Sequence, residues 1–362
     1  MIVVSILLPV VTCTILFPGS VTAQRYPDSL PIIGLGYELH RDVDLPWVNL
    51  GSRLLPFQRS TGGGYAVGSK TSGYDPRSLL SRSRTNSSEG AIFVALNYRL
   101  GAFGFLAGPS LQANGTANAG FYDQRMALEW VQENIHLFGG DKNQVTVMGE
   151  SAGGGSIMHQ ITAYGGRVPA PFQQAIVQSP GWVPVLSIYE QEQRFQNFLH
   201  FANVSSLEEA RNLPTDKVMD ANDRQISAAP YGSYGFGLSG QLGQSIRVMV
   251  GHNLNEGLLF TAPVTDDAGY LDFIRSTFPS ARDSIVAHIA NEMYPPVFNG
   301  SMGYTDQVGR AALTVGEATV VCNTFAMDLA YNNETFAYLF DVFPGLHAQD
   351  VEYTFYNPDT TW

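Results

Sequence analysis

The hydrophobic positions along this chain form short apolar runs separated by helix-like stretches. Residues 91–96 are an unbroken apolar run rich in strand formers, and similar runs occur at 145–148, 175–177, 246–250 and 335–343. Helical segments are predicted between most of them, at 121–138, 152–161, 189–202, 269–275 and 282–293. This alternation predicts an α/β fold with a mostly parallel sheet covered by helices on both faces.

The N-terminal part does not share this pattern. Residues 24–60 carry scattered charge, prolines at 27, 31, 46 and 56, and no sustained periodicity, which predicts an irregular segment. No linker divides the chain after residue 60. Residues 24–362 are therefore expected to form a single domain.

Residues 1–23 have the features of a leader. They carry no charge, and their apolar stretch is followed by Val21-Thr22-Ala23, a small-residue cleavage site. This predicts a secretory signal peptide, although a positive charge at its start is lacking. The alternative, a membrane anchor, is disfavoured because the apolar run is shorter than the roughly 20 residues that a span needs. No later segment is long and apolar enough to cross a membrane, so we expect a secreted, extracellular protein.

Five Asn-x-Ser/Thr sequons support export and predict glycosylated surface loops: Asn86, Asn114, Asn203, Asn299 and Asn333. Of the two cysteines, Cys13 lies in the leader, so the mature chain keeps only Cys322. An odd cysteine in a secreted chain implies a free thiol, an intermolecular bridge or a missing partner.

Composition narrows the function classes. With 44% hydrophobic and 12% aromatic residues, the chain is not a disordered protein. Its 20 Lys and Arg against 32 Asp and Glu give a net charge of −12 without a basic cluster, which excludes a nucleic-acid partner. No thiolate cluster is available for a metal, and the Gly-rich runs lack the strand–G-x-G-x-x-G–helix setting of a dinucleotide site. We expect no cofactor.

The segment Gly149-Glu150-Ser151-Ala152-Gly153 fits the G-x-S-x-G pattern of a nucleophilic serine. A predicted buried strand ends just before it, and a predicted helix begins just after Ser151. Glycines on both sides allow a sharp turn that lifts the serine hydroxyl above the sheet edge, with a helix N-terminus behind it. The alternative is an ordinary strand–turn–helix corner.

A nucleophilic serine needs a base to take its proton, and the base needs an acid to orient it. His347 and Glu256 each lie in a loop just past a predicted strand, where the catalytic groups of open α/β sheets gather. Asp266 and Asp267 are weaker candidates for the acid. The remaining histidines lie in helical patterns, in the irregular segment or too close to the acid: His136, His159, His200 and His288, then His40, then His252. We expect Ser151, Glu256 and His347 to act together.

The same chemistry needs donors for a developing oxyanion. The backbone N–H of Ala152, directly after the serine, is one candidate. Glycines at 62–64 could supply others because a backbone without side chains approaches a substrate closely. The alternative for this stretch is a flexible loop.

Several longer stretches resemble the type-B carboxylesterases, the family that includes cholinesterases and fungal esterases and lipases. They are NYRLGAFGF, FYDQRMALEWVQENIHLFGGD, VTVMGESAGGGS, IVQSPG, GHNLNEGLLF and PGLHAQDVEYTFYN, within residues 90–357. The resemblance implies an α/β-hydrolase fold, with Ser151 as nucleophile, Glu256 as acid and His347 as base. It also implies an oxyanion hole formed by Gly63, Gly64 and Ala152.

Departures from that family predict an incomplete fold. The glycines follow LPFQRST, a poor strand without the family's histidine, and the usual disulfide-bearing segment is missing between residues 39 and 62. Residues 234–246 are short, and the C-terminal helices that follow in relatives are absent. Cys322 resembles a cysteine whose partner lies in that tail. N-terminal strands and C-terminal helices are thus expected to be incomplete.

The expected function is a secreted serine carboxylic-ester hydrolase that forms an acyl-enzyme with a small-molecule or lipid ester. Two alternatives stay open: a non-catalytic, esterase-like binding protein, and an inactive fragment of such an esterase. Lipase, short-chain esterase and aryl-ester activities all fit the residues, and the oligomeric state is not indicated.

Overall fold

A computed structural model of the chain describes residues 32–34, 63–69, 76–83, 91–181, 186–229, 247–331 and 335–356. Several features expected from the sequence lie outside the described residues. These are the signal peptide at 1–23, His40, the sequons Asn86 and Asn333, and the segments 39–62 and 234–246 in which family residues are expected to be missing.

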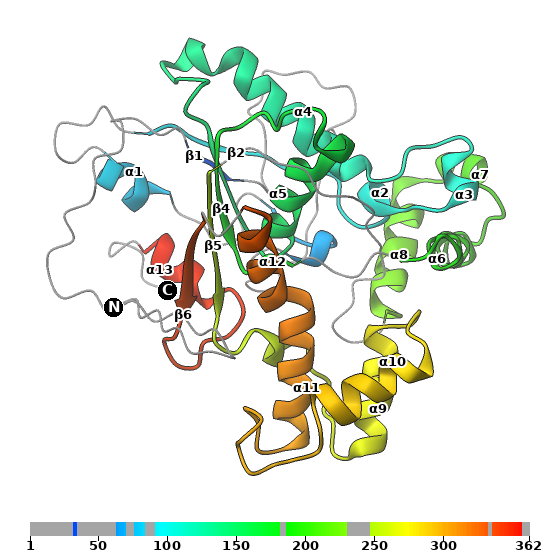
Figure 1. The fold of residues 1–362 in the computed structure, drawn as a ribbon. Coiled ribbons are helices and arrows are strands. Elements are labelled where there is room, and N and C mark those ends of the chain that lie inside the picture. Colours follow the sequence, from blue (N-terminus) through cyan, green and yellow to red (C-terminus); the bar gives the residue numbers. More distant parts are fainter. Residues whose placement is uncertain are drawn as a thin grey trace, which may run out of the picture.

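A six-stranded sheet forms the centre of the structure, with every neighbouring pair parallel and the order β2-β1-β3-β4-β5-β6 (Figure 1). The strands are β1 Ile32–Gly34, β2 Phe93–Ala95, β3 Thr146–Glu150, β4 Gln174–Gln178, β5 Arg247–Asn253 and β6 Phe336–Phe340. Strands β2 to β6 coincide with the five predicted runs, and the predicted parallel sheet is confirmed.

Strand β1 corrects the prediction that residues 24–60 are irregular. Ile33 pairs with Val94 of β2 on one side and with Val147 of β3 on the other, so β1 lies inside the sheet. A strand of three residues is too short to produce a detectable alternation, and its pairing with two distant strands is what defines it.

The longer helices are α4 Ala119–Asn134, α5 Ala152–Thr162, α6 Ile188–Ala202, α8 Thr215–Ser227, α9 Asp267–Thr277, α11 Gln307–Gly316 and α12 Cys322–Ala330. The shorter ones are α1 Arg77–Ser83, α2 Ala102–Phe105, α3 Pro109–Gln112, α7 Leu207–Arg211, α10 Asp283–His288 and α13 Gln349–Thr354. Single turns of 3-10 or π type occur at η1 Gly63–Tyr65, η2 Ile135–Phe138, η3 Ala163–Gly166, η4 Glu256–Phe260, η5 Ile289–Met293 and η6 Glu317–Val321.

Helices cover both faces of the sheet, as predicted. Successive strand residues point to opposite faces, and on one face Val147 and Val177 pack with residues of α4, α5 and α12 such as Leu128. On the other face, Met148 packs with Val351 of α13. The short C-terminal helix is thus anchored against the sheet.

Two further apolar clusters lie beside the sheet. One joins α2, α3, α6, α7 and α8 and includes Tyr65 of η1, and the other joins α9, α10 and α11. In Figure 1 the first group lies to the right of the sheet and the second below it. Among the described residues, no helix is both long and apolar enough to traverse a bilayer.

The central cluster yields a stability prediction. Leu128 is fully buried between α4 and the sheet, whereas Leu137, nearby in η2, is 70% exposed. Leu128→Ala should lower the free energy of unfolding by about 2–5 kcal/mol through lost burial and a cavity. Leu137→Ala, the matched control, should change it by less than about 0.5 kcal/mol. Urea titrations followed by circular dichroism measure both, and equal effects would contradict this assignment of the core.

Candidate functional site

Ser151 occupies the sharp turn between β3 and α5. Its backbone has φ 53° and ψ −119°, a conformation that non-glycine residues rarely adopt. Its N–H donates to the carbonyl of Gln178 in β4 at 3.0 Å, and its carbonyl accepts from Gly155 and Gly181, each at 2.9 Å. The turn is therefore held in its strained conformation by the neighbouring strand.

Glycines flank this turn for a steric reason. A Cβ atom on Gly149 would lie 2.6 Å from the backbone carbonyl of Gly153, and one on Gly155 would lie 2.3 Å from the carbonyl oxygen of Gly181. Both distances are shorter than real Cβ contacts. A larger residue at Gly149 or Gly155 would therefore require the backbone around the turn to shift.

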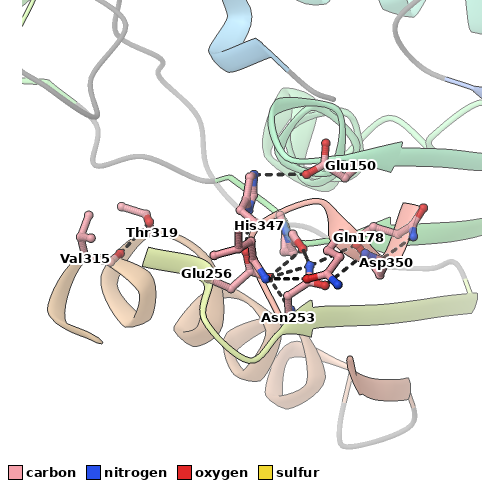
Figure 2. Close-up of polar contacts among 12 residues, drawn as sticks. Glu150, Gln178, Asn253, Glu256, Val315, Thr319, His347 and Asp350 are labelled. Atoms are coloured by element: carbon pink, nitrogen blue, oxygen red, sulfur yellow. Dashed lines mark hydrogen bonds and ion pairs between the residues drawn. The ribbon is translucent and has the colours of Figure 1, made fainter. Parts of the chain in front are cut away.

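Glu256 and His347 are brought together by the loops that follow β5 and β6. The backbone N–H of Asn255 donates to the carbonyl of Gly345 at 2.7 Å, and its side-chain amide donates to the carbonyl of Pro344 at 2.6 Å. These bonds extend the strand pairing into the loops. As a result, Nδ1 of His347 lies 2.5 Å from Oε2 of Glu256 (Figure 2).

Glu256 is 1% exposed, and its other oxygen is surrounded by donors. Oε1 accepts from the backbone N–H of Asn253 at 2.5 Å and from the hydroxyl of Ser179 at 2.7 Å. Burial alone would raise the pKa of Glu256, but the charge and hydrogen bond of His347 and these two donors hold that pKa below its ordinary value. The carboxylate is thus stabilised in its ionised form.

The far side of the His347 ring faces a second carboxylate. Nε2 lies 3.1 Å from Oε1 of Glu150, the residue directly before Ser151 (Figure 2). The ring of Phe260 packs against the imidazole, with centroids 4.8 Å apart. The structure shows no hydrogen bond between Ser151 and His347, both of which lie in the described part of the chain. The imidazole thus lies between the carboxylates of Glu256 and Glu150.

The residues expected to bind an oxyanion lie around the start of α5. Ala152 begins this helix and is buried in the same cluster as Tyr65, the last residue of the turn η1. Gly63 and Gly64 form the rest of that turn, with φ values of 49° and 55° that suit glycine. A backbone hydrogen bond also holds Tyr65 in place: its carbonyl accepts from the N–H of Gly101 at 2.7 Å.

The competing acid candidates have other roles. Asp266 caps the N-terminus of α9 by accepting from the backbone of Gly269 at 2.8 Å, and Asp267 forms an ion pair of 2.8 Å with Arg310.

None of the competing histidines that are described has a hydrogen bond or ion pair with Glu256, although the charge of Glu256 reaches His252. His252 lies within β5, with its ring beside Phe325, and His159 is buried in α5, where desolvation lowers its pKa to about 4. His136, His200 and His288 lie on η2, α6 and α10. Within the described parts of the chain, no group of three or more His, Cys, Asp or Glu side chains is arranged to hold a metal ion.

Sequence reasoning missed four polar residues of this site: Glu150, Ser179, Asn253 and Asp350. The first three stand at or just beyond the carboxyl ends of β3, β4 and β5. The rule that selected Glu256 and His347 applies to them as well, and it could have identified them. Asp350 carried no such signal, because it lies in a short helix after the base.

Comparisons with known proteins identify the family of this chain. A profile described as "Carboxylesterase family" matches residues 61–360. The protein named carboxylesterase patB from Penicillium expansum is 42% identical over 314 residues, which cover 82% of this chain and 56% of that protein. A secreted lipase of Arthroderma benhamiae is 31% identical over 330 residues, covering 86% of this chain and 63% of that lipase.

The crystal structure of Aspergillus niger EstA superimposes with a TM-score of 0.72 at 24% identity, covering 93% of this chain and 66% of that one. This similarity confirms the predicted α/β-hydrolase fold. The chain spans somewhat over half the length of the curated relatives that it matches. By its family profile and its relatives, this chain belongs to the carboxylesterase family.

Proposed function

We propose that this chain is a serine carboxylic-ester hydrolase in which Ser151 is the nucleophile, His347 the base and Glu256 the acid. The observation that carries the proposal is the buried His347–Glu256 contact of 2.5 Å beside a serine held in a strained turn. Strained serine turns and histidine–carboxylate pairs at the carboxyl edge of a parallel sheet are the parts that acyl transfer requires.

In the proposed reaction, neutral His347 accepts the Ser151 hydroxyl proton at Nε2 while Oγ bonds to the ester carbonyl carbon. The backbone N–H groups of Ala152, Gly63 and Gly64 donate to the oxyanion of the tetrahedral intermediate. The imidazolium then protonates the leaving alkoxide, and an alcohol departs from the acyl-enzyme. Water, deprotonated by the same nitrogen, attacks the acyl carbonyl carbon. The bond from that carbon to Oγ of Ser151 then breaks, the carboxylic acid is released, and Oγ takes the proton back from Nε2.

Glu150 has a place in this cycle. Its carboxylate lies 3.1 Å from Nε2, the nitrogen that carries the transferred proton. When His347 is charged, Nε2 can donate to Glu150; when His347 is neutral, its lone pair is repelled by that carboxylate and can accept from Ser151. The two partners of Nε2 in this cycle, Glu150 and Ser151, are neighbours in sequence.

The remaining sequence expectations belong to the same proposal. A leader at residues 1–23, followed by a single domain at 24–362, would deliver a secreted enzyme, in line with the names of the secreted lipase relatives. Three sequons among the described residues, Asn114, Asn203 and Asn299, are exposed and accessible to glycosylation. Esters of small molecules or lipids would be the substrates.

Covalent labelling tests the nucleophile. The secreted protein should react with a fluorophosphonate probe at Ser151, identified by peptide mass spectrometry, and hydrolyse p-nitrophenyl acetate. Ser151→Ala should abolish both signals. A folded protein that stays unlabelled would favour the binding-protein alternative, and an unlabelled aggregate would favour the inactive fragment.

Substitution of the acid tests its assignment. Glu256→Gln keeps the size of the side chain but favours the wrong imidazole tautomer, so kcat should fall by as much as about 10⁴-fold. Glu352→Gln, an exposed change on α13, is the control and should leave kcat unchanged. Steady-state hydrolysis measures both. An unaffected rate in Glu256→Gln would mean that another carboxylate is the acid.

The ionised state of Glu256 predicts a pH-dependent stability. Because its folded-state pKa lies below the unfolded value of 4.5, its contribution is fully present above pH 4.5 and is lost as the pH falls through the folded-state pKa. The difference in unfolding free energy between wild type and Glu256→Gln should therefore narrow below pH 4.5. Urea titrations from pH 7 to pH 3 measure it, and a constant difference would refute the depressed pKa.

A further inference from the structure

A third buried carboxylate, besides Glu256 and Glu150, lies near the Glu256–His347 pair. Asp350, in the first turn of α13, is 3% exposed. Its oxygens meet donors from three strands: the Asn253 amide of β5 at 3.1 Å, the Gln178 amide beside it in β4 at 3.0 Å, and the Tyr338 hydroxyl of β6 at 2.5 Å. Figure 2 shows Asn253, Gln178 and Asp350 clustered next to Glu256, with Gln178 and Asp350 to its right in this view.

Asn253 links the two carboxylates. Its side-chain nitrogen donates to Oδ1 of Asp350, and its side-chain oxygen accepts from the backbone N–H of Asp350 at 3.2 Å. This pair of bonds fixes which end of the amide faces which neighbour. Rotating the amide by half a turn would place its oxygen against the Asp350 carboxylate and its nitrogen against an N–H group, and both contacts would be repulsive.

In this orientation the same amide nitrogen reaches the acid. It lies 2.9 Å from the Ser179 hydroxyl and 3.3 Å from Oε1 of Glu256, while the Asn253 backbone N–H donates to that oxygen at 2.5 Å. Oε1 is thus held by Asn253 and Ser179, which leaves Oε2 to face His347.

We propose that Asp350 is a positioning residue for ester hydrolysis: it fixes the Asn253 amide, and through Asn253 it fixes the Glu256 carboxylate that orients His347. This inference rests on the proposed function. Asp350 touches neither the substrate nor the reacting atoms, so its effect passes entirely through Glu256.

The placement of Asp350 strengthens the argument. It follows His347 by three residues, and the helix that carries it is anchored to the sheet by Val351 and Phe355. One short segment therefore supplies both the base and the group that orients the acid.

Kinetics of Asp350 variants test the proposal with p-nitrophenyl acetate. Asp350→Ala should lower kcat by about 10- to 100-fold, with KM changed by less than about twofold, because orientation rather than binding is lost. Asp350→Asn should lose less, since its side-chain oxygen can still accept from Asn253. The control is Thr354→Val, which removes a bond to Gln178 from the same helix without touching Asn253 and should leave kcat unchanged. Wild-type kcat in both Asp350 variants would overturn the proposal.

A double-mutant cycle separates positioning from a general loss of structure. If Asp350 acts through Glu256, adding Asp350→Ala or Asp350→Asn to Glu256→Gln should lower kcat by less than about twofold further. If the kcat of the double variant instead fell by the product of the two single-variant decreases, the proposal would be overturned. Should Asp350→Ala fail to fold, the cycle with Asp350→Asn decides.

A readout without turnover keeps this inference distinct from the proposed function. The low-field NMR signal of the His347 Nδ1 proton, assigned by its loss in His347→Ala, should be present in wild type and in Thr354→Val. It should be shifted or lost in Asp350→Ala, and an unchanged signal there would overturn the inference. If the wild-type protein does not hydrolyse the ester but its signal is present and is shifted or lost in Asp350→Ala, only the proposed ester hydrolysis would be overturned.

Discussion

The buried carboxylate of Glu256 is the constraint on which the site depends. An isolated charge at 1% exposure would cost several kcal/mol, and none of the ion pairs among the described residues brings a lysine or arginine to it. Compensation comes from His347 and from donors on Asn253 and Ser179. These groups come from the ends of different strands and from the loops beyond them, so the carboxylate is stable only where those segments converge.

The parallel sheet makes that convergence possible. Since all strands run in the same direction, β3, β4, β5 and β6 deliver their carboxyl ends to one edge. Side chains that alternate along the strands pack against α4, α5 and α12 on one face of the sheet and against α13 on the other. The packing of α13 through Val351 matters most for chemistry, because this helix directly follows His347. Apolar contacts of α13 with the sheet therefore help to fix the loop that carries the imidazole.

The parts of this structure that depend on local sequence pattern could be predicted from the sequence. Five strands, the serine turn and the loop positions of Glu256 and His347 follow from apolar runs and from what comes directly after them. Strand β1 could not be predicted, because Ile32–Gly34 is defined by its two neighbours rather than by its own three residues. Asp350 was missed for the same physical reason: its donors come from Gln178, Asn253 and Tyr338, which are distant in sequence.

The two nitrogens of His347 meet different environments, and this difference suits a base that must gain and lose a proton at one position. At Nδ1, the 2.5 Å contact with Glu256 is backed by a network of buried donors that reaches Asp350. At Nε2, the neighbouring carboxylate is 3.1 Å away and belongs to the same turn as Ser151. In the reaction proposed above, the bond from Nδ1 to Glu256 would keep the tautomer of His347 while Nε2 turns from Glu150 to the serine hydroxyl.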